Sequence, residues 1–350
     1  LSIPLTVPPS TYPANDSAAM TAMAGIGQAS VKATPLQMAM VAATVANKGK
    51  QMRPYLVAST MDADLNTISS TTPSVLREPI DEATTRDRVT YGAGRLDEEC
   101  TGVVTCLWPT VDVICAARRI GANLIICHEA LFWNHGDHQD LISGNATYLA
   151  KRGLLDAWGG AVWRCHDYIH SKVPIDEGGA LVDGIFYGLA WKMGWLDCRT
   201  GNLSMCLDYR IPPMSGRDLA REVVRKLGLN GTRLIGDPRA LVERVHIPMH
   251  VLGVPEVDNR ETAFVDSERV DALVTMEFVD FTTSEYIRDA GMLHQGKCAI
   301  TVGHFNLEEP GMEYMVSWLP EALGTSGVPM HFVPMGDTYQ YVVAERGDRA

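Results

Sequence analysis

Beyond about residue 79, short apolar runs alternate along the chain with amphipathic segments. Residues 103–107 and 124–127 are apolar runs of strand length. Between them, residues 110–120 place Val113, Ile114 and Ala117 at helical spacing, so that they share one face. A strand, a helix and a strand in so short a stretch predict a right-handed βαβ unit with parallel strands.

The same alternation recurs four more times and predicts an α/β layered fold. In each case a predicted helix leads into a predicted strand, which is the pattern of parallel sheets covered by helices. The helix and strand pairs are residues 151–157 with 161–164, 216–227 with 233–235, 284–290 with 299–302, and 314–323 with 331–333.

The first 78 residues have a different pattern. Prolines are concentrated between residues 4 and 13, where we expect irregular structure because proline removes a hydrogen-bond donor. One helix is predicted over residues 36–47, since Thr34 can cap its start and Gly49 can end it. The sequence thus predicts a partly helical N-terminal segment at residues 1–78 and an α/β part at residues 79–350.

The two parts also differ in net charge. The net charge is −12, whereas residues 1–80 hold five basic and four acidic residues, so the acidic excess belongs to the second part. An acidic protein is poorly suited to bind a nucleic-acid backbone, and we expect a small-molecule partner and no nucleic acid.

No apolar run reaches the roughly 18 residues of a membrane helix, so no membrane partner is expected. The eight cysteines contain no C-x-x-C pair, which favours reduced thiols in a cytoplasmic protein.

Three stretches of the N-terminal segment carry a resemblance. Residues 25–30 (Gly-Ile-Gly-Gln-Ala-Ser), 33–39 (Ala-Thr-Pro-Leu-Gln-Met-Ala) and 46–49 (Ala-Asn-Lys-Gly) resemble part of a penicillin-binding transpeptidase domain. That family uses Ser-x-x-Lys, Ser-x-Asn and Lys-Thr-Gly motifs. The chain has no Ser-x-x-Lys and no Lys-Thr-Gly, and its one Ser-x-Asn begins at Ser143, in the other part. We therefore interpret residues 1–78 as an orphan fragment and expect no acyl-enzyme chemistry from it.

Histidines and carboxylates follow three of the predicted strands. Open α/β sheets place ligands at such strand ends. Imidazole together with carboxylate is a donor set that suits Fe, Mn, Zn or Co, so three such ends in one chain predict a metal site. The residues are His128, Glu129 and His135 after residues 124–127; His166, Asp167 and His170 after residues 161–164; and His304 and Glu308 after residues 299–302.

These motifs are similar to those of the NIF-three-like dinuclear-metal family. The similarity spans about residues 80–342 and rests on residues 121–129, 163–170 and 303–314, with Gly236-Asp237-Pro238 and Pro334-Met335-Gly336-Asp337 in addition. It implies a two-lobed α/β fold with a metal cleft, two divalent metal ions per chain and a toroidal hexamer.

The resemblance also implies individual metal ligands. Within it, Glu129 stands where the family's commoner branch has a second histidine, and His170 stands where that branch has an aspartate. The two exchanges leave the number of imidazoles and carboxylates unchanged, so two metal ions still fit, while the bridging ligand stays open. The predicted ligands are His128, Glu129, His166, Asp167, His170, His304 and Glu308.

Metal-assisted hydrolysis is the chemistry that such a pair of ions favours. Two neighbouring ions lower the pKa of a water molecule and polarise a carbonyl or phosphoryl oxygen. We predict a hydrolase of a small polar substrate, such as a cyclic amide or a nucleotide-like ring. Glu277 and His135 are candidate catalytic residues, although His135 can equally orient a metal ligand. A non-catalytic metal-binding or regulatory hexamer and an iron or copper redox enzyme are the open alternatives.

Overall fold

The computed structural model describes residues 10–11, 32–46, 51–55, 57–62, 64, 66–77, 86–176, 178–248, 250–324 and 327–343. The chain divides into two units, Leu1–Thr85 and Arg86–Ala350. The predicted boundary between residues 78 and 79 lies outside the described residues. Within the described ranges, no helix is long and apolar enough to cross a membrane.

The N-terminal unit contains the helix that the sequence predicts. Helix α2 (Pro35–Ala46) begins where Oγ1 of Thr34 accepts a hydrogen bond from the N–H of Gln37 (3.2 Å). Residues 25–30, Asn47 and Gly49 lie outside the described residues. Two antiparallel pairs complete the described part, β1 (Gln51–Met52) with β4 (Val75–Arg77) and β2 (Ser59–Met61) with β3 (Thr67–Ser70).

The first lobe of the larger unit is a five-stranded sheet. Its spatial order is β15 (Met330–Phe332), β6 (Val103–Cys106), β7 (Leu124–Cys127), β8 (Ala161–Arg164) and β5 (Arg88–Tyr91). The first four strands are parallel, and β5 pairs antiparallel with β8 at the edge. Helices α3 (Val111–Ile120) and α4 (Ala146–Trp158) join the central strands, which confirms the predicted parallel βαβ unit.

The second lobe is a six-stranded mixed sheet. Its order is β11 (Arg233–Gly236), β14 (Cys298–Thr301), β13 (Ala272–Thr275), β12 (Leu241–His246), β10 (Asp208–Ser215) and β9 (Arg199–Thr200). Only the pairs β12 with β13 and β13 with β14 are parallel in this lobe. The prediction that residues 216–235 form another parallel unit is wrong, because β11 pairs antiparallel with β14. The helices are α7 (Gly216–Leu227), α8 (Pro255–Ser267) and α9 (Thr283–Met292).

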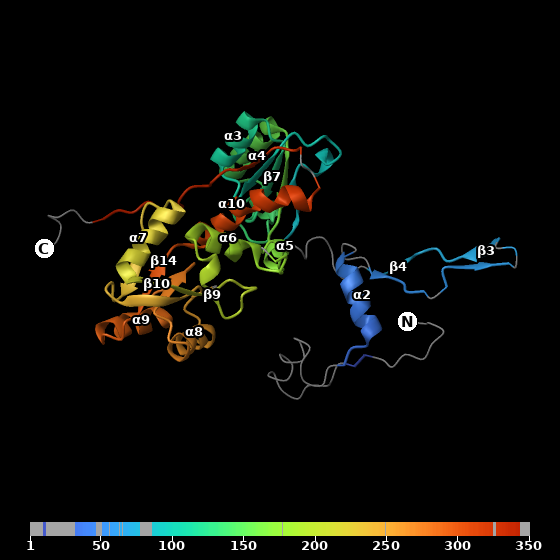
Figure 1. Cartoon of the computed structure of the whole chain (residues 1–350). Helices are drawn as coiled ribbons and strands as arrows, with labels where there is room; N and C mark the ends of the chain where they lie inside the picture. Colours follow the sequence, from blue (N-terminus) through green and yellow to red (C-terminus); the bar gives the residue numbers. More distant parts are fainter. Residues whose placement is uncertain are drawn as a thin grey trace. The chain divides into compact units, whose positions relative to one another are not determined.

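Two helices connect the lobes. Helices α6 (Gly184–Met193) and α10 (His304–Ala322) pack side by side between the two sheets (Figure 1). Helix α10 starts just after β14 of the second sheet, and Thr105 of the first sheet donates a hydrogen bond from Oγ1 to the Met312 carbonyl (2.9 Å). The predicted helix at residues 314–323 is the C-terminal half of α10. One helix therefore spans both lobes.

Helices α6 and α10 approach each other at two glycines. A Cβ on Gly188 would lie 2.5 Å from the Cα of Gly311, and a Cβ on Gly311 would lie 2.5 Å from the Cα of Ile185. Since real side chains do not approach a backbone so closely, both positions require glycine. The contact fixes where α10 lies, and with it the residues of its first turns.

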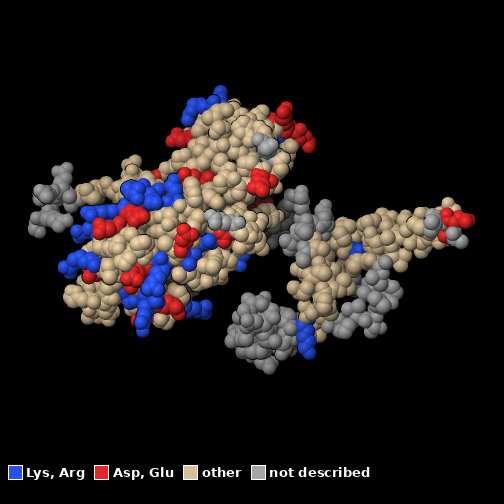
Figure 2. Space-filling view, in the orientation of Figure 1, with Lys and Arg blue, Asp and Glu red and all other residues tan. Residues whose placement is uncertain are grey.

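Acidic and basic side chains are interspersed on the face of the Arg86–Ala350 unit that Figure 2 shows. Partly exposed pairs such as Lys192 with Glu313 (2.6 Å) add little to stability, because water screens them. Stability comes mainly from the apolar cores of the lobes, where Ile125 and Leu155 are fully buried in the first and Leu219 and Val242 in the second.

We expect Gly311→Ala to lower the free energy of unfolding by about 1–3 kcal/mol or more, because its methyl group would overlap the backbone of α6. Chemical denaturation measures this change. Gly153→Ala is the matched control, since Gly153 is also helical but a Cβ there meets nothing within 4 Å. The control should be neutral or stabilising by up to about 1 kcal/mol. Equal effects of the two substitutions would contradict the close helix crossing.

Candidate metal centre

The three strand ends that the sequence singles out meet at one cleft. β7 leads into His128, β8 leads through the short helix α5 (Asp167–His170) into His170, and β14 leads into His304 at the start of α10. A cavity of about 460 Å³ opens here, with His170, His304 and Glu308 among its lining residues. The first two histidines come from one lobe and the third from the other.

Each of these three histidines is held through the Nδ1 atom of its ring. Nδ1 of His128 donates to the Cys165 carbonyl (3.1 Å), and Nδ1 of His170 donates to Oδ2 of Asp183 (2.9 Å). Nδ1 of His304 donates to Oε1 of Glu277. A neutral imidazole that donates through Nδ1 carries its lone pair on Nε2, so each of the three Nε2 atoms can bind a metal ion when its ring is neutral.

The three Nε2 atoms surround the carboxylate of Glu308. Oε2 of Glu308 lies 3.1 Å from Nε2 of His304 and 3.6 Å from Nε2 of His128. Oε1 lies 3.9 Å from Nε2 of His170. Oε1 of Glu129 is a second carboxylate oxygen in the cluster, 3.9 Å from Nε2 of His304.

The hydrogen bonding and protonation of the buried atoms in the cluster fit a metal ion. Nε2 of His128 is buried and makes no hydrogen bond with a described residue, and the contacts of the buried Oε2 of Glu308 are with the Nε2 atoms of His304 and His128. Buried polar atoms are normally partnered, and a cation between them would satisfy both. Burial, together with the neighbouring His166 and His170, holds the pKa of His128 well below its usual value. His128 is therefore neutral, which is the protonation state that binds metals.

Glu129 is held in the cluster by a buried arginine. Arg164, at the end of β8, lies with Nη2 3.0 Å from Oε2 of Glu129. The same guanidinium donates to the carbonyls of His128 (3.1 Å) and His135 (2.6 Å). Arg164 is 1% exposed, so its charge is compensated inside the protein by these three partners. The loop after β7 is thereby fixed around the site.

The remaining predicted residues lie around this core. His166 stacks on His128 with ring centroids 4.4 Å apart, and burial lowers its pKa to about 3. The side chain of His135 is 56% exposed, with Nδ1 3.9 Å from Oε2 of Glu129. Asp167 is bound by Arg86 (2.9 Å) and belongs to none of the groups of possible metal ligands among the described residues.

Four groups of possible ligand atoms, each within 4.8 Å of one another, can be formed from these residues. Three of them draw on the predicted ligands. The fourth adds His250, which faces Glu277 together with His304. The groups are His128, His166 and His170; Glu129, His135 and His166; His128, Glu129 and Glu308; and His250, Glu277 and His304.

Glu277 binds two histidines. Its Oε2 accepts from Nδ1 of His250 (2.8 Å), and its Oε1 accepts from His304. Burial alone would raise the pKa of Glu277, but the two hydrogen bonds lower it to about 2. Burial likewise opposes protonation of His304, yet Glu277 and Glu308 raise the pKa of that imidazole to about 10. Glu277 is therefore ionised and orients His304.

Three residues that support the site are not apparent from the sequence: Arg164, Asp183 and His250. Asp183 has the sequence signal of a helix cap, and it does cap α6 by accepting from the N–H of Ile185 (3.0 Å). Its second role, with His170, depends on a contact that spacing cannot reveal. In the sequence, Arg164 is only a charged residue at the end of an apolar strand. His250 follows β12, so the strand-end argument would have included it had β12 been predicted.

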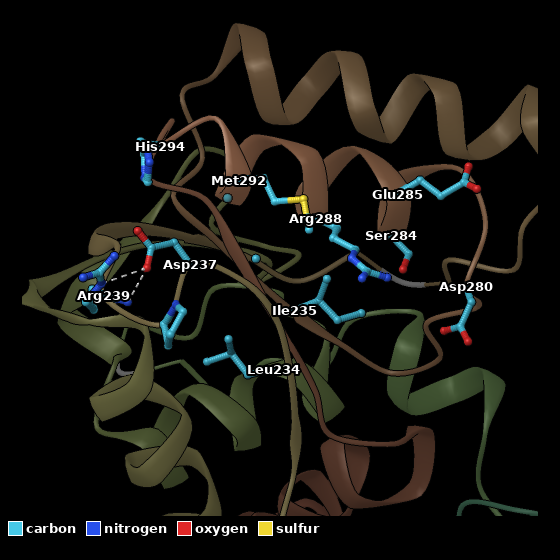
Figure 3. A pocket seen from close by; sticks show the side chains of 13 residues that line it. Leu234, Ile235, Asp237, Arg239, Asp280, Ser284, Glu285, Arg288, Met292 and His294 are labelled. Carbon is cyan, nitrogen blue, oxygen red and sulfur yellow. Dashed lines mark hydrogen bonds and ion pairs between the residues drawn. The ribbon is translucent and has the colours of Figure 1, made fainter. Parts of the chain in front are cut away.

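A second cavity, of about 560 Å³, lies beside β11 and α9 and shares no lining residue with the metal cleft. Figure 3 shows Asp237 paired with Arg239 (3.6 Å) at one end of it, and Asp280 and Glu285 at the other. The Gly236-Asp237-Pro238 motif forms the turn there, where Asp237 also accepts from the N–H of Arg239 (2.9 Å). No group of possible metal ligands among the described residues lies in this cavity.

The N-terminal segment is similar to part of a known protein family. Residues 8–91 match the family described as "Penicillin binding protein transpeptidase domain". The peptidoglycan D,D-transpeptidase PbpA of Mycolicibacterium smegmatis is 52% identical over 79 residues, which are 23% of this chain and 16% of that protein. PbpA of Mycobacterium tuberculosis is 54% identical over 69 residues, 19% of this chain and 14% of that protein. The chain thus spans a small part of these relatives, and the predicted resemblance is confirmed.

Solved structures share the fold of the larger part. A hypothetical protein of Staphylococcus aureus, SA1388, matches with a TM-score of 0.53 and 17% identity over 73% of this chain and 92% of that chain. A Bacillus cereus protein related to NIF3 matches with a TM-score of 0.51 and 15% identity over 73% and 93%. These likenesses confirm the predicted NIF-three-like α/β fold.

We expect Asp183→Asn to weaken metal binding about 10- to 100-fold, because an amide no longer fixes the tautomer and orientation of His170. Stability should change little, since asparagine also caps helices. Competition with a chelator of known affinity measures the change. Asp208→Asn is the matched control, because Asp208 pairs with His246 (2.7 Å) outside the four groups. Equal metal affinity of both variants and the unmodified protein would contradict the role of Asp183.

Proposed function

We propose that the Arg86–Ala350 unit is a metal-dependent hydrolase that holds two divalent metal ions per chain. The observation that carries the proposal is the set of three Nε2 atoms around the Glu308 carboxylate, beside an accessible cleft. When bound, divalent ions would supply Lewis acidity and a water molecule of lowered pKa. The nitrogen and oxygen donors suit Fe, Mn, Zn or Co.

The cysteines near the cluster support a donor set without sulfur. Cys127 and Cys165 are buried. Burial raises the pKa of the Cys165 thiol to about 12 and also raises that of Cys127. Since metals bind the thiolate rather than the thiol, imidazoles and carboxylates are the better ligands here at neutral pH.

Glu308 is the residue best placed to serve both metal ions. Its Oε1 faces His170, and its Oε2 faces His128 and His304. A carboxylate whose two oxygens face different imidazoles can bind two ions at once. Glu308 would therefore help to hold both metal ions, and Glu129 would be a further ligand.

His135 and Glu277 take different roles in this proposal. Partial desolvation and the charge of Arg86 lower the pKa of His135, so its half-exposed ring is neutral and can accept a proton. Glu277 has a pKa of about 2, which makes it a weak base. We assign proton transfer to His135 and the orientation of His304 to Glu277.

Access to the cluster favours catalysis over storage. A site for storage or structure is closed by protein ligands, whereas a catalytic site leaves room for a substrate. The cavity of about 460 Å³ beside the cluster is lined in part by Arg86, His250 and Ser171, which suit a small polar substrate. The small-molecule partner, the hexamer and the cytoplasmic location stay predictions of the sequence.

The N-terminal unit has no catalytic role in this proposal. Its named relatives are peptidoglycan D,D-transpeptidases, and this chain spans 16% of the first of them. The sequence contains no Ser-x-x-Lys motif to supply the nucleophile of such an enzyme.

The proposal is tested by hydrolysis of a panel that contains 5-oxoproline, dihydrouracil and GTP. We expect turnover of at least one member by protein loaded with zinc or manganese, and none after chelation. His135→Gln should lower kcat about 10²- to 10⁴-fold with unchanged metal content, because it removes the group that accepts the proton.

His138→Gln is the matched control, since His138 lies in the same loop, is exposed and belongs to none of the four groups. It should retain full activity. Equal rates with and without metal, or no turnover of any compound in the panel, would contradict the proposed hydrolase.

A further inference from the structure

A third cavity adjoins the metal cleft. It measures about 630 Å³ and shares His304 and Met276 with the lining of the metal cleft. Its other walls come from β11, from the ends of β13 and β14, and from the chain segment after β15. A molecule in this cavity would therefore lie next to the histidine that α10 contributes to the metal cluster.

The segment after β15 is fastened by the motif Gly336-Asp337, to which the proposed hydrolysis assigns no role. Oδ1 of Asp337 accepts from Nδ2 of Asn306 (2.9 Å), and Oδ2 accepts from the N–H of Asn230 (2.8 Å). Nδ2 of Asn230 in turn donates to the Tyr339 carbonyl (2.9 Å). Asn306 is buried two residues after His304, so these bonds tie the segment directly to the start of α10.

This fastening places two tyrosines in the wall of the cavity. A Cβ on Gly303 would lie 2.7 Å from Cε2 of Tyr339, and one on Gly231 would lie 2.9 Å from Cδ2 of Tyr341. Both rings thus lie directly against backbone that carries no side chain. Phe278 and Phe305 are also among the lining residues, so aromatic residues contribute to several walls of the cavity.

Two polar groups in the same cavity are available to a ligand. Arg233 is exposed at the start of β11, and its guanidinium makes no hydrogen bond or ion pair with the residues that the structure describes. Oγ1 of Thr301 is buried and likewise has no partner within the described ranges. Glu277 is the one carboxylate among the lining residues, and it already accepts hydrogen bonds from two histidines.

We infer that this cavity binds a planar aromatic ring that carries an anionic group, a carboxylate or a phosphate. Aromatic side chains bind flat rings by stacking and edge-to-face contacts, for which a saturated ring has no equivalent. The planar guanidinium of Arg233 forms paired hydrogen bonds with carboxylate or phosphate, and Thr301 adds a hydroxyl. The inference that such a ring is part of the substrate rests on the proposed hydrolysis. The inference that the cavity binds such a ring rests on the cavity alone.

The test is calorimetric titration of the full-length, zinc-loaded protein with four probes: benzoate, phenyl phosphate, cyclohexanecarboxylate and benzamide. We expect benzoate or phenyl phosphate to bind at least about tenfold more tightly than cyclohexanecarboxylate and benzamide. The tighter of the two anions identifies the anionic group. Equal affinity for benzoate and cyclohexanecarboxylate, or no binding of any probe, would overturn the inference.

Variants separate the contributions of ring and charge. Arg233→Gln should remove the preference for benzoate over benzamide. Tyr339→Leu should remove the preference for benzoate over cyclohexanecarboxylate, whereas Tyr339→Phe should keep that preference. Arg239→Gln, an exposed arginine of the second cavity, is the matched control and should change nothing. An Arg233→Gln protein that binds benzoate as the unmodified protein does would overturn the assignment of the anion site.

Repeating the titration after chelation keeps this inference apart from the proposed hydrolysis. Carboxylates can also bind a metal directly, but such binding would not distinguish an aromatic from a saturated ring. We expect the preference for the aromatic ring to persist in metal-free protein. Loss of that preference on chelation would overturn the cavity as the binding site, whatever the outcome of the hydrolysis assay.

Discussion

A buried carboxylate surrounded by three imidazole nitrogens is the constraint on which the cleft depends. Glu308 is almost fully buried, and the His128, His170 and His304 rings all turn Nε2 toward it. With Nδ1 donating elsewhere, His128 presents a lone pair at Nε2, and His170 and His304 do so once their rings are neutral, so a metal ion would meet nitrogen lone pairs and negative charge together in a poorly solvated place. Burying such an arrangement is costly unless a cation compensates it. A divalent metal removes this cost, which explains why polar atoms without hydrogen-bond partners are kept there.

The rest of the unit holds this cluster from two sides. His128 and His170 come from the first lobe, whereas His304 and Glu308 lie on a helix that starts in the second. The ligands meet only if α10 lies at a fixed position between the sheets, and the contact of Gly188 with Gly311 provides that position. Arg164, Asp183 and Glu277 then orient the ligands through charge-assisted hydrogen bonds. Removing one of these groups would leave a buried charge without its partner.

Local sequence signals predicted local structure well and long-range pairing less well. The unit β6, α3 and β7 was predictable because its apolar periods and the Thr110 cap act within a few residues. The direction of β11 was not, since residues 216–235 look like the other helix and strand pairs and only the neighbouring β14 decides the pairing. Helix α6 escaped prediction because it is apolar on nearly every side, so it shows no helical period. The predicted ligands followed from strand ends, but the residues that orient them depend on contacts between distant segments.

Anomalous diffraction from crystals loaded with zinc or manganese, measured at the absorption edge of the metal, tests the central claim most directly. The account predicts close to two metal ions per chain, with anomalous density between Glu308 and the Nε2 atoms of His128, His170 and His304. The density should disappear when crystals are grown from chelated protein. Metal bound elsewhere with none at this cluster, or no metal bound at all, would contradict the account.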